Sequence, residues 1–215
     1  MSTTLAVDTS VVVAAALAVD GRIVASATVD DSRAHAEQLM PLVQRVLRDA
    51  DLRLADLDRI VTGVGPGPFT GLRVGVVTAL TLGEVLGVPV TGACSLDAVA
   101  AAWASEGAPE EFLVVSDARR KEVYWARYDA AGRRIAGPDV SAPSDLPDLP
   151  LAGPGAHVVS DHVAGPTTLD AAWLATTDLP DAGTEPLYLR RPDAEVPTRT
   201  KSALPQAKLG LRRTR

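Results

Sequence analysis

Two short acidic segments carry the residue types that could contact a phosphate group. Each follows one apolar run and precedes another, so each is expected to form the turn between two strands. Residues 117–121 (Asp-Ala-Arg-Arg-Lys) have long basic side chains where a backbone cradle for β- and γ-phosphates needs glycine, which disfavours ATP turnover. In the other turn small hydroxyl side chains could approach a phosphate, or could simply cap the turn. The candidate nucleotide contacts are Asp8, Thr9 and Ser10.

The other residues with catalytic side chains do not form a recognisable catalytic or metal motif. His35 lies at an expected helix start with no second ligand nearby, and His157 and His162 have a spacing unlike common zinc patterns. Asp97 is a further candidate general base beside the two turn aspartates, although carboxylates near turns are usually caps or solvated. We therefore predict no metal site and no catalytic residue.

A loop rich in proline and glycine at residues 63–71 resembles a nucleotide-binding loop only superficially. It lacks the Gly-Lys-Ser/Thr of a P-loop, and Pro68 stands where a dinucleotide fingerprint has its third glycine. The alternation of proline and glycine instead favours a rigid turn from which Phe69 protrudes, with Thr70 as the expected cap of the next helix. The loop is therefore assigned to packing or partner docking.

The elements that must hold these turns occur in an order that is partly repeated. Strands are expected at 5–7, 11–19, 23–29, 59–64 and 89–91, and helices at 34–50, 70–86 and 96–104. This βββαβαβα order is typical of a ribonuclease-H-like lobe, assigned to residues 1–105. Strand, acidic turn and strand recur at 113–128, so we predict an α/β actin-like ATPase fold with a reduced second lobe at 106–197. That lobe includes a helix near 168–175, and a basic, unstructured tail follows at 198–215.

Composition limits the classes of function. The formal charge is −6 although residues 198–215 carry six bases and no acid, so residues 1–197 are strongly acidic. An acidic surface repels the phosphate backbone, which makes this part of the chain a poor candidate for binding nucleic acid over a broad face. RNA contact is expected through the tail or a partner. The single cysteine, Cys94, excludes an internal disulfide and suits a reducing cytoplasm, and the apolar run 9–19 is too short to span a bilayer. We expect a cytoplasmic protein without a membrane anchor.

Five segments in order resemble the TsaB (YeaZ) family of tRNA threonylcarbamoyladenosine biosynthesis proteins. The resemblance covers residues 4–193, and Pro68 stands where that family usually has serine. The segments are residues 5–10 (LAVDTS), 35–42 (HAEQLMPL), 65–75 (GPGPFTGLRVG), 117–124 (DARRKEVY) and 186–190 (PLYLR).

The resemblance implies a non-catalytic protein that serves as the dimerisation platform for a larger paralogue, TsaD. TsaD carries the metal and transfers the threonylcarbamoyl group to the adenosine beside the tRNA anticodon. Ser95 and Val99 stand here where TsaD has its pair of metal-binding histidines. The two long helices of the first lobe are expected to pair with the helices of the partner. The implied interface residues are His35, Leu39, Val43, Phe69, Thr70, Arg73 and Val74.

The resemblance also implies further partners. A homodimer is expected when the chain is alone, TsaE joins the larger complex, and tRNA is reached indirectly. No cofactor is expected for the chain by itself, while ATP or ADP could lie at the interface of the assembled complex.

Two other functions are weighed against this one. An ATP-dependent small-molecule kinase would need a glycine-rich second turn, which residues 118–120 do not supply. A peptidase would need a zinc motif or an activated nucleophile, and neither is readable in the sequence, so it ranks last.

Overall fold

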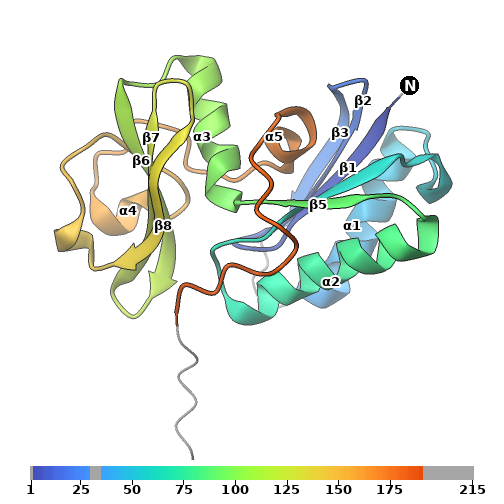
Figure 1. Ribbon diagram of the computed structural model, residues 1–215, viewed down its shortest axis with the longest axis horizontal. Helices are drawn as coiled ribbons and strands as arrows, with labels where there is room; N and C mark the ends of the chain where they lie inside the picture. Colours follow the sequence, from blue (N-terminus) through green and yellow to red (C-terminus); the bar gives the residue numbers. More distant parts are fainter. Residues whose placement is uncertain (1, 30–34, 191–215) are drawn as a thin grey trace, which may run out of the picture.

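The computed structural model describes residues 2–29 and 35–190 of the 215-residue chain, and it shows two sheets side by side (Figure 1). The expected tail at 198–215 lies outside the described residues. The first sheet has the strand order β3-β2-β1-β4-β5. Its strands are β1 (Thr3–Asp8), β2 (Val13–Val19), β3 (Arg22–Val29), β4 (Arg59–Gly63) and β5 (Val90–Ala93). The first three are antiparallel neighbours, and β4 and β5 run parallel to β1, as the βββαβαβα order requires.

Both faces of this sheet are buried, because the alternating side chains of β1 and β2 fill two different cores. One core takes the larger side chains, such as Leu5, Val7 and Leu17, and packs them against α1 (His35–Asp49) and α2 (Phe69–Leu86). The other takes small ones, such as Ala6 and Ala16, and packs them against α3 (Ser95–Glu106) and α5 (Ala171–Thr176). Alanines on that face allow the two helices to lie close to the strands.

The second sheet repeats the first four strands of the first. Its order is β8-β7-β6-β9, with β6, β7 and β8 antiparallel and β9 parallel to β6. The strands are β6 (Glu111–Arg119), β7 (Glu122–Asp129), β8 (Arg134–Ser141) and the two-residue β9 (Leu151–Ala152), followed by the short helix α4 (Ala156–Val159). This confirms the actin-like two-lobe fold and the reduced second copy.

The chain then returns to the first sheet, which the expected boundary at 106–197 did not anticipate. Helix α5 packs on β1 and β2 and touches α3, so it belongs to the core of the first lobe (Figure 1). Further along, the backbone N–H of Ala182 donates to Gly92 O, and that of Leu187 donates to Val64 O, both at 2.8 Å. The C-terminal segment 178–190 therefore lies along the β5 edge.

Two helix starts differ from the expected ones. Helix α2 begins at Phe69 with Pro68 as its N-cap, rather than behind a Thr70 cap. Proline suits this place because its backbone lacks the N–H that a helix start would leave unpaired. Helix α3 begins at Ser95 with Cys94 as N-cap, and the Ser95 hydroxyl donates to Asp8 instead of capping the helix.

Candidate functional site

The two acidic turns lie on either side of a cavity between the lobes. The cavity has a volume of about 480 Å³. Residues from the first turn, the start of α2 and the second turn line it, among them Ser10, Thr70, Gly71, Asp117 and Arg119. The repeat in the sequence thus brings the two turns together, as it does in the expected fold.

The first turn uses its polar atoms to hold the structure together. Asp8, Thr9 and Ser10 are each 1% exposed or less. One carboxylate oxygen of Asp8, Oδ1, accepts from the backbone N–H of Ser10 at 2.7 Å and from its hydroxyl at 2.6 Å, and the other accepts from Ser95 Oγ at 2.5 Å. Thr9 Oγ1 donates to Gly71 O at 2.7 Å. These bonds join β1 to the starts of α2 and α3.

Glycines allow this close packing around the first turn. A Cβ on Gly63 would lie 1.7 Å from Asp8 Oδ2, and one on Gly75 would lie 2.4 Å from Thr9 Oγ1. Gly75 also donates its N–H to that oxygen at 3.0 Å. The residues expected to contact a nucleotide are therefore buried and hydrogen-bonded within the protein. Their place as nucleotide contacts stays a prediction, and the bonds above favour the capping interpretation.

The second turn is open and basic. Arg119, Arg120 and Lys121 are exposed and have φ values of 63°, 54° and 63°. Asp117 Oδ1 accepts from the Arg119 N–H at 2.7 Å, and its other oxygen is 3.2 Å from the Arg119 guanidinium. No glycine lies among these residues, so the turn offers charge rather than an unobstructed backbone to a ligand.

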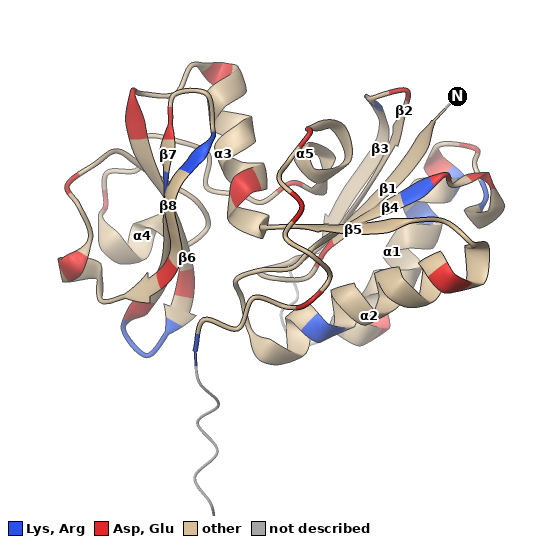
Figure 2. Ribbon diagram, in the orientation of Figure 1, with Lys and Arg blue, Asp and Glu red and all other residues tan. Residues whose placement is uncertain are grey.

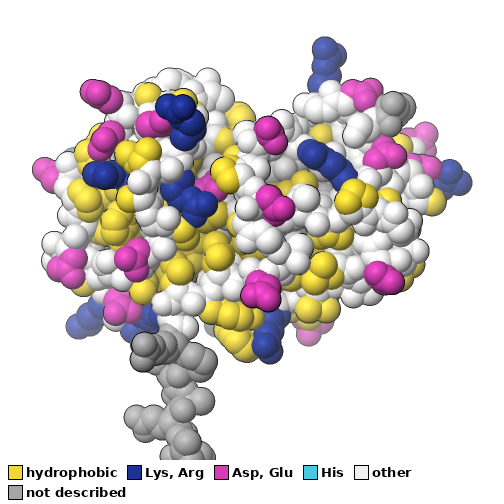
Figure 3. All heavy atoms as spheres, viewed as in Figure 1, with side chains coloured by type: hydrophobic (Ala, Val, Ile, Leu, Met, Phe, Trp, Pro, Cys, Tyr) yellow, Lys and Arg dark blue, Asp and Glu magenta, His cyan; other side chains and the backbone are white. Residues whose placement is uncertain are grey.

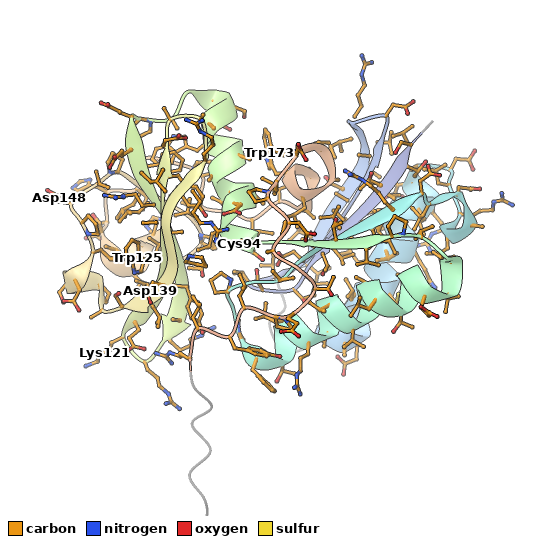
Figure 4. All side chains as sticks on the ribbon, in the orientation of Figure 1. Cys94, Lys121, Trp125, Asp139, Asp148 and Trp173 are labelled. Carbon is orange, nitrogen blue, oxygen red and sulfur yellow. The ribbon has the colours of Figure 1, made fainter. Side chains whose placement is uncertain are left out.

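Asp97, the third candidate base, is buried between the lobes. Its Oδ1 accepts from the Tyr128 hydroxyl at 2.8 Å and lies 3.4 Å from Arg134 Nε. Burial raises the pKa of Asp97, and the nearby Arg134 charge partly opposes that rise. Burial, together with Asp97, also raises the pKa of the Cys94 thiol, which lies where the two lobes meet, to about 12 (Figure 4). Both groups are buried away from solvent, which disfavours Asp97 as a general base.

Replacing the Asp97 carboxylate by an amide is expected to remove a pH-dependent loss of stability. A carboxyl with a raised pKa in the folded state adds stability that is fully present below its ordinary pKa of 3.8 and is lost as pH rises through the raised value. The free energy of unfolding of Asp97→Asn should therefore rise relative to that of the wild type as pH increases through the raised pKa, because the amide does not ionise. Denaturant titrations across this range measure the difference, which should grow with pH. Plots of the free energy of unfolding against pH that stay parallel for the two proteins would contradict the prediction.

The aromatic cluster near 124–128 is mainly core. Tyr128 is fully buried and its ring stacks on Phe112 at 5.6 Å, while Tyr124 is 6% exposed. Trp125, on the opposite face of β7, donates its indole N–H to Ser141 Oγ at 3.0 Å. The two tyrosines therefore belong to the core and offer no ring for base stacking.

A second candidate surface begins where the Pro-Gly loop ends. Phe69 is 51% exposed and, as expected, protrudes from the loop. Its ring centroid lies 4.9 Å from that of Tyr188, and the Arg73 guanidinium lies 4.2 Å from the Phe69 centroid. Arg73 Nε also donates to the Tyr188 hydroxyl at 3.0 Å. The C-terminal segment thereby extends the surface at the start of α2.

The outer face of α2 continues this surface with apolar side chains. Val77, Leu80 and Val85 are 58%, 41% and 76% exposed, and hydrophobic side chains lie on the surface over α2 in Figure 3. The described residues include one helix, α2, that is long and apolar enough to cross a membrane, with 33% of it buried. We call the face formed by Phe69, Arg73, Val77, Leu80, Val85 and Tyr188 the α2 surface.

The expected interface residues separate into two groups. Leu39 and Val43 are 1% and 0% exposed and lie in the core between α1 and the sheet, so the expectation that they face a partner is wrong. Phe69, Thr70 and Arg73 are exposed and Val74 is half-buried. His35 is the first residue of α1, and its side chain lies outside the described part of the structure.

Sequence reasoning missed the most exposed part of the α2 surface. Val77, Leu80 and Val85 were not named, although Val77 follows Phe69 and Arg73 at a spacing of four, the helical repeat that would have found it. Tyr188 could not be found this way, because it comes from a distant segment.

Metal ligands do not gather in the described structure. Within residues 2–29 and 35–190 there is no group of three His, Cys, Asp or Glu side chains placed to hold an ion. The prediction that the chain holds no metal itself remains a prediction.

Comparison with known proteins places the chain in a family. A family model described as TsaD, tRNA N6-adenosine threonylcarbamoyltransferase, matches residues 25–189. An uncharacterized protein of Mycobacterium tuberculosis is 45% identical over 208 residues, covering 91% of this chain and 95% of that protein. The tRNA threonylcarbamoyladenosine biosynthesis protein TsaB of Escherichia coli is 38% identical over 97 residues, 45% of this chain and 42% of that one.

A solved structure gives the same answer for the fold. The crystal structure of a Pseudomonas aeruginosa protein, described as similar to the peptidase YeaZ, superposes with a TM-score of 0.75 at 29% identity, covering 88% of this chain and all (100%) of that one. The chain belongs to the TsaD family of tRNA N6-adenosine threonylcarbamoyltransferases, and within it resembles the TsaB (YeaZ) proteins.

Proposed function

We propose that this chain acts in threonylcarbamoyladenosine biosynthesis as the non-catalytic partner of a TsaD paralogue. The biosynthetic role rests on the family and on the relatives named TsaB. The non-catalytic role is supported by the first turn, whose polar groups are occupied within the protein, and by the glycine-free second turn. The observation that carries the docking part of the proposal is the exposed apolar face of α2.

A TsaD paralogue is the occupant that this surface fits. The TsaD model matches residues 25–189, so a TsaD chain has its own copy of this lobe and of α2. Two related lobes can pair about a pseudo-two-fold axis with the same helix face from each side, as in isologous interfaces. Aromatic side chains and arginine are enriched in such interfaces, and here Arg73 lies over the ring of Phe69, which packs against Tyr188.

The inner face of α2 argues that its outer face meets protein rather than lipid. Gly71, Gly75 and Gly83 are buried against the sheet, and a Cβ on Gly83 would lie 2.3 Å from Val90. Moving α2 into a bilayer would expose the core that it covers. The apolar composition of α2 is therefore explained if its inner side packs on the sheet and its outer side packs on a protein partner.

Mixing the purified chain with its TsaD paralogue tests the proposal. We expect the chain alone to elute as a homodimer through the α2 surface, and the mixture to elute as a heteromeric complex with the light-scattering mass of both chains. Two separate peaks at micromolar concentration would overturn the proposal. Recruitment of TsaE, and ATP or ADP at the assembled interface, stay predictions that the same complex can test.

An ATP-dependent kinase remains the alternative function. Sustained ATP hydrolysis by the isolated chain would revive it, whereas the proposal expects none above background.

A further inference from the structure

The turn between β6 and β7 holds three successive basic residues in the left-handed backbone region. Residues other than glycine, asparagine and aspartate rarely adopt this conformation, because their Cβ meets the backbone. Other tight turns of this chain use glycine, with Gly21 between β2 and β3 at φ 73° and Gly132 between β7 and β8 at φ 74°. At residues 119–121 the chain instead keeps arginine, arginine and lysine, so positive charge is retained where a stable turn would favour Asn-Gly.

Positive charge gathers around this turn. The four bases Arg119, Arg120, Lys121 and Arg190 lie with the acids Asp117 and Glu122, which gives a net charge of +2 at the turn, and Glu37 of α1 lines the cavity beside Arg119. Each acid at the turn is ion-paired with an arginine, Asp117 with Arg119 and Glu122 with Arg190. Figure 2 shows basic residues at this turn and at the neighbouring end of the described chain, and Figure 4 shows Lys121 at the outer end of the hairpin.

The C-terminal segment fixes the turn to the first lobe. Arg190 donates to Arg119 O at 3.2 Å and pairs with Glu122, while the N–H of Leu187, three residues earlier, is hydrogen-bonded to Val64 O. The turn is thus held from both lobes. Residues 191–215 contain seven bases and two acids, so a basic sequence follows directly from this point.

We propose that the β6–β7 turn contacts the phosphate backbone of RNA, with Arg119, Arg120 and Lys121 on the phosphates and Arg190 as a positioning residue. The inference rests on the proposed function, in which tRNA is the RNA that the complex acts on. Long basic side chains at an exposed turn neutralise phosphates without reading bases. On β7, Tyr124 and Tyr128 are buried, and the half-buried Trp125 packs against the core of the second lobe, so the strand offers no free ring for base stacking and the contact is independent of sequence.

A double substitution distinguishes the effect of the positive charge on RNA binding from the effect of the turn conformation on stability. Arg120→Asn with Lys121→Gly removes two positive charges and introduces the pair that a left-handed two-residue turn prefers. We expect the full-length double variant to melt at a higher temperature than the wild type. We also expect it to bind fluorescently labelled unmodified tRNA about 5-fold to 10-fold more weakly, with the slope of log affinity against log salt smaller by roughly one to two. A purely structural turn predicts the higher melting temperature with unchanged binding.

Arg133 supplies a control that removes one positive charge elsewhere on the same sheet. It is exposed in the β7–β8 turn at the opposite end of the same sheet, and it pairs with Asp129 at 2.7 Å much as Arg119 pairs with Asp117. Arg133→Gln should leave both the tRNA affinity and the salt slope unchanged. An equal loss of log affinity per charge removed, with the control showing about half the loss of the double variant, would show an effect of overall charge alone and would overturn the proposal.

The remaining outcomes are also decisive. If the double variant has the tRNA affinity and the salt slope of the wild type, the proposed RNA contact is overturned. If the same samples still form the complex with the TsaD paralogue, the proposed function is unaffected. Failure of the wild type to form that complex would reject the proposed function whatever the tRNA result. Charge-dependent binding of the turn to vesicles of anionic lipid, without binding to tRNA, would also overturn the proposal.

Discussion

Val77→Asp and Leu80→Asp are each expected to weaken association with the TsaD paralogue by about 100-fold or more. A carboxylate placed in the centre of an apolar interface must be desolvated without a partner, and about 3 kcal/mol corresponds to that loss of affinity. Both side chains are exposed in the chain alone, at 58% and 41%. Stability should therefore change by no more than about 0.5 kcal/mol. Isothermal titration of each variant with the paralogue measures the first effect, and thermal unfolding measures the second.

Ile135→Asp is the matched control for this prediction. Ile135 is 45% exposed on β8 of the second sheet, away from the α2 surface, so its substitution adds the same charge without touching the proposed interface. Its affinity should equal that of the wild type. Val43→Asp serves as the opposite control, because a charge at this fully buried position should unfold the protein rather than only weaken docking. Equal affinity for the Val77 variant and the wild type would contradict the assignment.

Asp8→Ala is expected to lower the free energy of unfolding by about 3–5 kcal/mol, because it leaves three buried donors without their acceptor. These donors are the Ser10 N–H, the Ser10 hydroxyl and the Ser95 hydroxyl. The melting temperature should fall by roughly 10 °C. Asp8→Asn keeps one acceptor oxygen and should cost less. Chemical denaturation of the three proteins tests the ranking.

Asp117→Ala provides the comparison from the second turn. Asp117 occupies the equivalent place in the repeat but is part-exposed, and its partners are the N–H and side chain of Arg119. Its removal should cost no more than about 1 kcal/mol. An Asp8→Ala protein as stable as the wild type but defective in complex formation would indicate a functional rather than a structural role for the first turn.

The order of elements could be predicted from the sequence because turns and periodicity are local properties. Asp20-Gly21, the apolar repeat of residues 34–50 and the repeated acidic turns each specify nearby structure. The two-lobe fold followed from their order. Helix α5 was expected near its observed place, yet its packing on the first sheet was not. Only the alanines on one face of β1 and β2 hint that a helix covers that face closely.

The interface was harder to predict for a related reason. Apolar periodicity shows which side of a helix is apolar, but not whether sheet or partner covers it. Leu39 and Val43 therefore looked like interface residues, although the sheet buries them. Helix α2 is apolar on two sides, and only its packing distinguishes Gly75, which touches Thr9, from Val77, which faces outward. Tyr188 joins the surface through a contact 115 residues away from Arg73 in sequence, which no local pattern encodes.

The measurement that tests the docking claim most directly is the site of contact in the assembled complex. A photo-crosslinking residue in place of Thr81, which is exposed beside Leu80 on α2, should join the chain covalently to the TsaD paralogue in high yield. The same residue in place of Val158, 46% exposed on α4, should give no crosslink. Efficient crosslinking from position 158 and none from position 81, in a complex that forms normally, would show that the partner docks elsewhere and would contradict the account.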